Sequence, residues 1–315
     1  MSGRRNAEVD GSPVGHPASK LRAVTREIAT PDGRTLSVYE GGDPGGAAVI
    51  WHHGTPGCGA IYEPWNADAR ELGVRLIGYD RAGYGGSSRQ HGRAVAAAAA
   101  DTTAIADALG LDRFATWGVS GGGPHALACG ALCDERLVAV GSLASVAPWE
   151  AEGLDWLEGM GESNHEEFGV TLEGEEPLRA ALERDAAGMA GLKPSDLVSA
   201  FTSLVGPADQ AVLQTGELAA YLVDTIEIGL APGVDGWVDD DLAFAKPWGF
   251  ELSAIDRPVL VVHGADDRFV PISHGAWLLE HVPGSEARLS GDDQGHLTLY
   301  ERSVRETHQW LLDRF

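Results

Sequence analysis

Five short apolar runs constrain the fold of this 315-residue chain more than any other feature. Each run is nearly continuous and ends in glycine or a polar residue; in chain order they are AAVIWHHG, VRLIGYD, RFATWGVS, VAVGSLAS and PVLVVHG. Strands without polar alternation are buried on both faces, which is typical of a parallel sheet covered by helices. Helical segments such as AVAAAAADTTAIADALG, closed by Gly110 as a C-cap, lie between the runs. The sequence therefore predicts an α/β fold with a mostly parallel, doubly wound sheet.

This alternation of strand and helix breaks between residues 149 and 250. No convincing buried strand occurs there, and apolar residues recur near helical spacing in EPLRAALERDAAGMAG, PSDLVSAFTSLVG and ELAAYLVDTIEIGL. We therefore expect a core formed by residues 21–148 and 251–315, interrupted by a helical insertion at 149–250. Residues 1–20 are polar and rich in Gly and Pro, and we expect them to form a disordered tail.

The net charge excludes two classes of partner. The chain carries a formal charge of −24, and residues 149–250 hold 21 Asp and Glu against four Lys and Arg. Nucleic acids and anionic membrane surfaces require a basic face, so neither is an expected partner. No apolar run approaches the ~18 residues that a membrane span needs, and the first residues lack the apolar region of a signal peptide. We expect a soluble, cytoplasmic protein.

The three cysteines, Cys58, Cys129 and Cys133, are best interpreted as small buried apolar residues. No CxxC motif or His/Cys cluster accompanies them, although Cys129 and Cys133 would share one face of a helix. Cys58 lies in the HHGTPG segment and could instead line a site there.

One serine is surrounded by glycines where a predicted strand meets a predicted helix. Ser120 ends the run RFATWGVS, and the helix-like segment PHALACGAL follows. A direct turn from strand to helix would leave the serine hydroxyl on a sharp, exposed corner. It would also bring the residues two positions before and after the serine close together, which explains why Gly118 and Gly122, without side chains, stand there. It would also place the Gly121 N–H at a helix N-terminus. A phosphate-binding loop is the alternative, but neither Gly-Lys-Ser/Thr nor GxGxxG is present.

A nucleophilic serine requires a base, usually a histidine oriented by a carboxylate. His296 is the candidate base because it follows the short strand EARLSG on a loop before the C-terminal helix. Asp266 and Asp267 follow the last core strand and are the candidate acids. The other late histidines lie in predicted helices, where histidines are more often surface residues: His274, His281 and His308.

From about residue 22 to its end, the chain resembles the α/β-hydrolase fold family. HHGTPG, with His53-Gly54, resembles the loop after the family's third strand, and DRAGYGGSS resembles the D-x-x-G-x-G-x-S loop after the fourth. The Ser120 corner follows the fifth strand. The acid pattern Gly-x-x-Asp-x-x-Val-Pro and the closing Gly-His are matched by residues 264–271 and 295–296. The chain order Ser, Asp, His is also that of the family.

This resemblance implies roles for individual residues. It assigns the role of the acid to Asp267, with Asp266 as the alternative. It also implies that the main-chain N–H groups of Thr55 and Gly121 form an oxyanion hole. Because only the amide is needed, the Thr55 hydroxyl is expected to be incidental. The helical insertion at 149–250 falls where family members carry a cap over the active site, structural decoration being the alternative. Neither a metal nor an organic cofactor is expected.

The leading interpretation is a serine hydrolase that cleaves a carboxylic ester, or a related acyl compound, through an acyl-enzyme. The same loops also resemble those of proline iminopeptidases, an aminopeptidase function that would need an acidic anchor for a free amino terminus. A non-catalytic binding protein on this scaffold is a further alternative. Dehalogenases and epoxide hydrolases resemble the chain poorly because they use a carboxylate where it has Ser120, and cofactor-free haloperoxidase activity would be a side reaction.

The acidic insertion also bears on the choice of substrate. If it surrounds the entrance to the site, its field would favour neutral or cationic substrates over anionic ones. Alternatively, the acidic residues only solvate its outer face.

Overall fold

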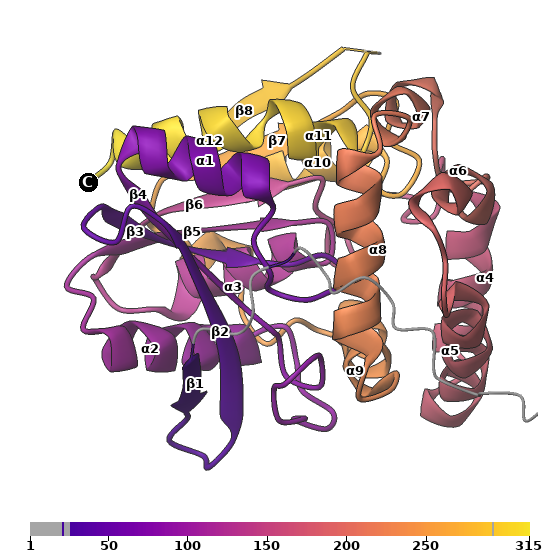
Figure 1. Ribbon diagram of the computed structural model, residues 1–315, viewed down its shortest axis with the longest axis horizontal. Helices are drawn as coiled ribbons and strands as arrows, with labels where there is room; N and C mark the ends of the chain where they lie inside the picture. Colours follow the sequence, from indigo (N-terminus) through magenta and orange to yellow (C-terminus); the bar gives the residue numbers. More distant parts are fainter. Residues whose placement is uncertain (1–20, 22–25, 292) are drawn as a thin grey trace, which may run out of the picture.

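The computed structural model describes residues 21, 26–291 and 293–315 (Figure 1). The expected N-terminal tail, residues 1–20, lies outside the described residues. Eight strands form a sheet in the order β1-β2-β4-β3-β5-β6-β7-β8. The strands are β1 (Arg26–Ala29), β2 (Thr35–Gly42), β3 (Ala47–His52), β4 (Val74–Tyr79), β5 (Phe114–Val119), β6 (Leu137–Leu143), β7 (Val259–His263) and β8 (Glu286–Leu289).

The sheet is antiparallel at its β1 and β2 end and parallel elsewhere. β1 and β2 form an antiparallel hairpin whose turn closes through the Gly33 N–H, which donates to the Thr30 carbonyl at 3.0 Å. β2 is also antiparallel to β4, whereas all pairs from β4 through β3, β5, β6 and β7 to β8 are parallel. Every residue of the central strand β5 is buried, as its continuous apolar run predicts. The predicted, mostly parallel sheet is confirmed.

Helices cover both faces of this sheet. α1 and α12 pack on one face around a core that includes Trp65 and Leu311, and α2, α3 and α10 pack on the other around Leu127 and Leu278 (Figure 1). These core helices, with the short α11, are α1 (Glu63–Leu72), α2 (Ala97–Leu109), α3 (Gly122–Leu132), α10 (Ile272–His281), α11 (Thr298–Arg302) and α12 (Val304–Leu312). The doubly wound arrangement is therefore confirmed.

All regular elements between β6 and β7 are helical, and Figure 1 shows α4 to α9 gathered at one side of the sheet. They are α4 (Glu162–Thr171), α5 (Glu175–Met189), η1 (Pro194–Asp196), α6 (Leu197–Ala200), α7 (Pro207–Leu213), α8 (Glu217–Leu230), α9 (Asp235–Phe244) and η2 (Leu252–Ala254). Leu178 and Leu182 of α5 are fully buried in a cluster with residues of α9. These contacts explain the apolar spacing that predicted α5.

The segment PSDLVSAFTSLVG departs from its predicted single helix. It forms only η1 and one turn of α6, and then continues in turns. Thr202 Oγ1 donates to the carbonyls of Val198 and Ser199 at 3.2 and 2.7 Å, so its hydroxyl competes with the main-chain donors that would extend α6.

Cys58, Cys129 and Cys133 are buried, as expected of small apolar residues, and Cys58 packs within a hydrophobic core. Across the described part of the chain, every helix is too short or too polar to cross a bilayer.

Candidate active site

Ser120 occupies a sharp corner between β5 and α3. Its φ of 54° lies in the left-handed region, which is unfavourable for a residue with a side chain and costs about 1–3 kcal/mol. The corner is held by main-chain hydrogen bonds, because the Ser120 N–H donates to the Leu143 carbonyl at 2.9 Å. A Cβ atom at Gly118 would collide with the Gly122 carbonyl, and one at Gly122 with the carbonyl of His52. The crowding expected from the motif is therefore present.

Asp267 and His296 come together although they are 29 residues apart in the chain. Asp267 Oδ2 lies 2.8 Å from His296 Nδ1, and the main-chain N–H groups of Phe269 and Val270 donate to Oδ1 at 2.9 and 2.8 Å. The Phe269 ring stacks on the imidazole, with ring centroids 4.6 Å apart. These contacts fix both the carboxylate and the plane of the imidazole.

Asp266 points elsewhere. Its Oδ1 lies 3.5 Å from Arg268 Nη2, and its Oδ2 accepts a long hydrogen bond of 3.4 Å from the Ala208 N–H. Of the two candidate acids, the structure thus brings Asp267 to His296 and directs Asp266 toward α7.

A second carboxylate near His296 was not found by sequence reasoning. Asp209 of α7 accepts hydrogen bonds from the main-chain N–H groups of His296, Leu297 and Thr298 at 3.0, 2.8 and 2.9 Å. It thereby satisfies donors at the start of α11 and fixes the loop that carries His296. Burial raises the pKa of Asp209 to about 6, against the opposing effects of His296 and these donors. Because Asp209 is 87 residues from His296, no local motif could have indicated this role.

The charge around the imidazole determines its basicity. Burial lowers the pKa of His296, but the charge and hydrogen bond of Asp267, together with the charge of Asp209, outweigh burial and raise it overall. The imidazole is therefore a stronger base than an ordinary histidine.

The expectation that helix-borne histidines lie at the surface is wrong for two of the three. His308 is fully buried, and so is His274, which lies between the Ala147 N–H at 3.0 Å and the Trp156 carbonyl at 2.9 Å. His281 is exposed and stacks on Trp277. The amphipathic helices α10 and α12 turn His274 and His308 toward the sheet, where packing decides burial.

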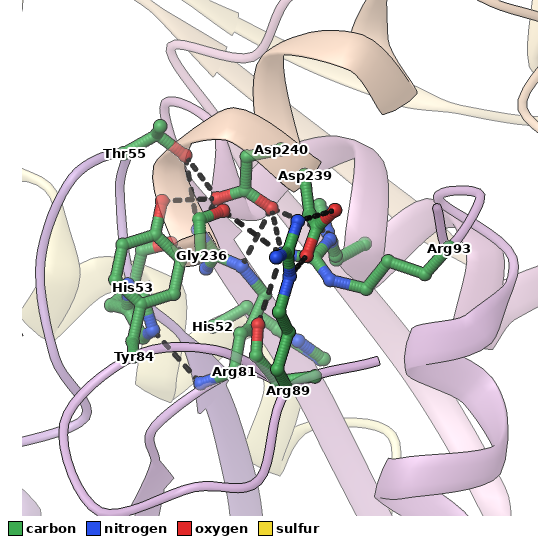
Figure 2. Close-up of polar contacts among 12 residues, drawn as sticks. His52, His53, Thr55, Arg81, Tyr84, Arg89, Arg93, Gly236, Asp239 and Asp240 are labelled. Atoms are coloured by element: carbon green, nitrogen blue, oxygen red, sulfur yellow. Dashed lines mark hydrogen bonds and ion pairs between the residues drawn. The ribbon is translucent and has the colours of Figure 1, made fainter. Parts of the chain in front are cut away.

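Thr55 and Gly121, whose amides are the candidate oxyanion hole, are neighbours. A Cβ atom at Gly121 would collide with Thr55 Oγ1, so only glycine fits beside this loop. The Thr55 hydroxyl, which was expected to be incidental, donates to Asp240 Oδ2 at 2.7 Å (Figure 2). Asp240 belongs to α9, 185 residues away, which is why the sequence did not reveal this contact.

A cavity of about 780 Å³ connects this corner with the helices between β6 and β7. Ser120, Gly121 and Thr55 line it at one end, and residues of α4, α5, α6 and α9, with Phe269 and Val270, line much of the remainder. Most of its remaining wall is apolar, with side chains such as Phe244 and Phe269. A site of this size and composition suits a small organic molecule.

Two carboxyl groups face each other in the wall of the cavity. Glu167 of α4 accepts a hydrogen bond from Trp237 Nε1 at 2.9 Å, whereas the buried Asp241 Oδ2 has no hydrogen-bond partner among the described residues. Burial raises the pKa of both groups, and the neighbouring Glu167 raises that of Asp241 further. The described residues contain no group of three or more His, Cys, Asp or Glu side chains arranged to hold a metal ion.

Comparison with known proteins agrees with this architecture. A family model described as the alpha/beta hydrolase fold matches residues 47–303. The chain is 27% identical over 251 residues to a non-heme chloroperoxidase from Streptomyces lividans, which covers 79% of this chain and 84% of the relative. It is 24% identical over 307 residues to epoxide hydrolase A from Mycobacterium tuberculosis, covering 90% and 94% of the two chains.

Among solved structures, a thermophilic esterase from Thermogutta terrifontis superimposes with a TM-score of 0.65 and 22% identity. The match covers 91% of this chain and 98% of the esterase, and at this identity it shows the shared fold alone. The family match covers most of the sheet together with the Ser120 corner, Asp267 and His296. The chain therefore belongs to the α/β-hydrolase fold family and is a hydrolase.

Proposed function

We propose that the protein hydrolyses a small carboxylic ester, or a related acyl compound, through an acyl-enzyme on Ser120. The observation that carries this proposal is the cavity, because Ser120 lines it together with Thr55 and Gly121. A carbonyl carbon within reach of the serine hydroxyl would there lie beside both candidate amides. The 2.8 Å contact between Asp267 and His296 supports the same proposal by supplying an oriented base.

The proposed reaction uses five residues. Ser120 Oγ attacks the carbonyl carbon while its proton passes to His296 Nε2, and the Thr55 and Gly121 N–H groups stabilise the oxyanion. Asp267 holds the Nδ1–H tautomer and stabilises the imidazolium. His296 then gives the proton to the leaving alcohol, and a water activated by the same imidazole releases the acid.

The activities named for the relatives are weaker guides to function than the nucleophile of this chain. Epoxide hydrolases are expected to carry a carboxylate at the position of Ser120, so acyl transfer fits this chain better than epoxide opening. The similarity to a non-heme chloroperoxidase leaves peroxidation as a side reaction of the same three residues.

The Ser120→Ala variant tests this function. It should lose roughly 10⁴- to 10⁶-fold in kcat on any ester that the wild type cleaves. Because it removes one partly exposed hydroxyl, its circular dichroism and melting temperature should match the wild type. Wild-type turnover by the purified variant, after contaminating esterases have been excluded, would refute the proposal.

We further propose that the cavity prefers neutral or cationic acyl substrates, and that Glu167 and Asp241 are responsible. Asp241 Oδ2, for which the described residues provide no hydrogen-bond partner, is a buried acceptor in the cavity wall that an ammonium or hydroxyl donor of a substrate would satisfy. The same pair could anchor the free amino terminus that an aminopeptidase requires, which makes that function the second candidate. The alternative, that the acidic residues of 149–250 only solvate an outer face, does not account for these two side chains.

Matched cationic, neutral and anionic esters of equal size, with an aminoacyl amide beside them, test this preference. Asp241→Asn should lower the cationic-to-neutral ratio of kcat/KM by about tenfold, a change of about 1.4 kcal/mol. Glu173→Gln is the matched control, since it removes an exposed charge of the same region away from the cavity. The preference should persist at high salt, because contacts made inside the cavity are screened little.

Equal effects of Asp241→Asn and Glu173→Gln, or a preference for the anionic ester, would reject the role of the pair. Faster cleavage of the aminoacyl amide than of its ester would favour the aminopeptidase function.

A further inference from the structure

Three consecutive aspartates of α9 face three different neighbours. Asp239 pairs with Arg89 at 2.8 Å and accepts from the Gly92 N–H, whereas Asp241 lines the cavity. Asp240 points toward the loop after β3, which carries Thr55, as Figure 2 shows. All three aspartates are buried, so each carboxyl group needs partners within the protein.

Asp240 is the most fully paired of the three. Its Oδ2 accepts hydrogen bonds from Thr55 Oγ1 at 2.7 Å, Arg81 Nη2 at 2.6 Å and the Tyr84 hydroxyl at 2.9 Å. Its Oδ1 lies 2.7 Å from Arg93 Nη2. Burial would raise the pKa of Asp240, but the charges of Arg81 and Arg93 hold it well below its usual range, so the group stays ionised.

Arg81 extends the network from Asp240 to the main chain of the loop. Its Nη1 donates to the His53 carbonyl, and its Nη2 contacts the Gly54 carbonyl at 3.2 Å and Thr55 Oγ1 at 3.0 Å. The His53 ring contributes from the other side, with Nδ1 2.7 Å from the Gly54 carbonyl and Nε2 accepting from the Arg81 N–H at 3.0 Å. The Gly54 carbonyl is therefore held by two side chains.

The planar peptide bond transmits this restraint to the proposed oxyanion hole. The Gly54 carbonyl and the Thr55 N–H belong to one trans peptide unit, in which the two groups point in opposite directions. Fixing the carbonyl therefore fixes the direction of the N–H, and the Thr55 hydroxyl anchors the same residue from its side chain.

We propose that Asp240 is a positioning residue for the oxyanion hole. It orients the Gly54–Thr55 peptide through Arg81 and Thr55, so that the Thr55 N–H points at the developing oxyanion. This proposal rests on the ester-hydrolase function above and adds a residue of α9, outside the sheet, on which catalysis depends. Preorganised donors of this kind act on the transition state more than on bound substrate.

Substitutions at Thr55 test the proposal with little risk to folding. Thr55→Val keeps the shape and the amide but removes the hydroxyl, and we expect kcat to fall roughly 10- to 100-fold while KM changes less than about threefold. The loss should be smaller than the ~10²–10³ that follows removal of an oxyanion donor itself. Thr55→Ser restores the hydroxyl and should recover kcat to within about threefold of wild type.

Tyr84→Phe is the matched control because the Tyr84 hydroxyl donates to the same oxygen of Asp240. Loss of the Tyr84 hydroxyl removes one donor to Asp240 but leaves the contacts of Thr55 and Arg81 that hold the loop. We therefore expect kcat to stay within about threefold of wild type. A second pair compares neighbours on α9: Asp240→Asn should lower kcat as Thr55→Val does, and Asp239→Asn should not.

Binding of a trifluoromethyl ketone separates positioning from a purely structural role. Ser120 Oγ adds to its carbonyl carbon, His296 takes the proton, and the new oxyanion occupies the hole. Its affinity should fall in Thr55→Val by the same factor as kcat/KM, with the melting temperature close to that of Tyr84→Phe. Equal kcat losses in Thr55→Val and Tyr84→Phe, or unchanged affinity in Thr55→Val, would overturn the proposal.

The Thr55 series carries this test even if Asp240→Asn does not fold. If instead Ser120→Ala stays active, the hydrolase proposal itself fails, so the two failures are distinguishable.

Discussion

His296 lies between two carboxylates that act on different atoms. Asp267 contacts the ring at Nδ1, whereas Asp209 accepts from the main-chain N–H of the same residue. The first therefore controls the tautomer and basicity of the imidazole, and the second holds its loop. Both charges raise the pKa of His296 against the effect of burial. The pKa of the proposed base is thus raised by Asp267, which follows β7, and by Asp209, which belongs to α7.

Asp267→Asn should damage catalysis in two measurable ways. The wrong imidazole tautomer should lower kcat by roughly 10⁴-fold. Only neutral His296 can accept the serine proton, so activity is lost as the pH falls through its pKa. A raised pKa places the acidic limb of wild-type kcat/KM above pH 6.5, the ordinary histidine value. Removing the Asp267 charge should shift that limb to lower pH in the residual activity.

Asp266→Asn is the control, because Asp266 is directed to Arg268 and α7. It should change kcat by less than about tenfold and leave the pH limb in place. If Asp266→Asn is the more damaging variant, the acid has been assigned to the wrong residue.

At the residue scale, the sequence predicted what local motifs encode. The Ser120 corner, Asp267 and His296 each sit in a short pattern, and the structure brings Asp267 and His296 into contact. Asp240 and Asp209 escaped prediction because their partners are 185 and 87 residues away. Without those contacts, an aspartate in an acidic stretch is indistinguishable from a solvated surface charge.

At the element scale, strands were predicted more reliably than the helices between β6 and β7. A short, continuous apolar run is typical of a strand in a sheet that is covered on both faces. The five predicted runs form β3 to β7. α5 and α8 were predicted from apolar spacing. α9 was not predicted because Asp239, Asp240 and Asp241 interrupt its apolar spacing. All three are nevertheless buried: Asp239 and Asp240 have charged partners, and Asp241 lines the cavity. Tertiary pairing there overrides hydrophobic periodicity.

α9 is also the element that joins the parts of the proposed site. Its successive aspartates contact Arg89, the Thr55 loop and the cavity (Figure 2). A rigid displacement of α9 would therefore alter the proposed oxyanion amide of Thr55 and the cavity wall together. Variants that loosen α9 should consequently affect kcat and substrate preference at the same time.

At the scale of the whole molecule, the acidic excess has two distinct uses. Many acidic residues of 149–250 are exposed, as a solvated surface requires, but Asp209, Asp239, Asp240 and Asp241 are buried among partners. Composition alone could identify the acidic region. It could not separate surface charge from the buried charge beside the His296 loop, the Thr55 loop and the cavity, because that distinction depends on burial.

In the proposed mechanism, Ser120 carries the acyl group during turnover. Rapid acid quenching of the enzyme with an activated ester, followed by proteolysis and mass spectrometry, tests it most directly. We predict a burst of released alcohol stoichiometric with enzyme, and an acyl adduct on the peptide that contains Ser120. Both should be absent in Ser120→Ala. An adduct on another residue, or steady turnover by Ser120→Ala, would contradict the account.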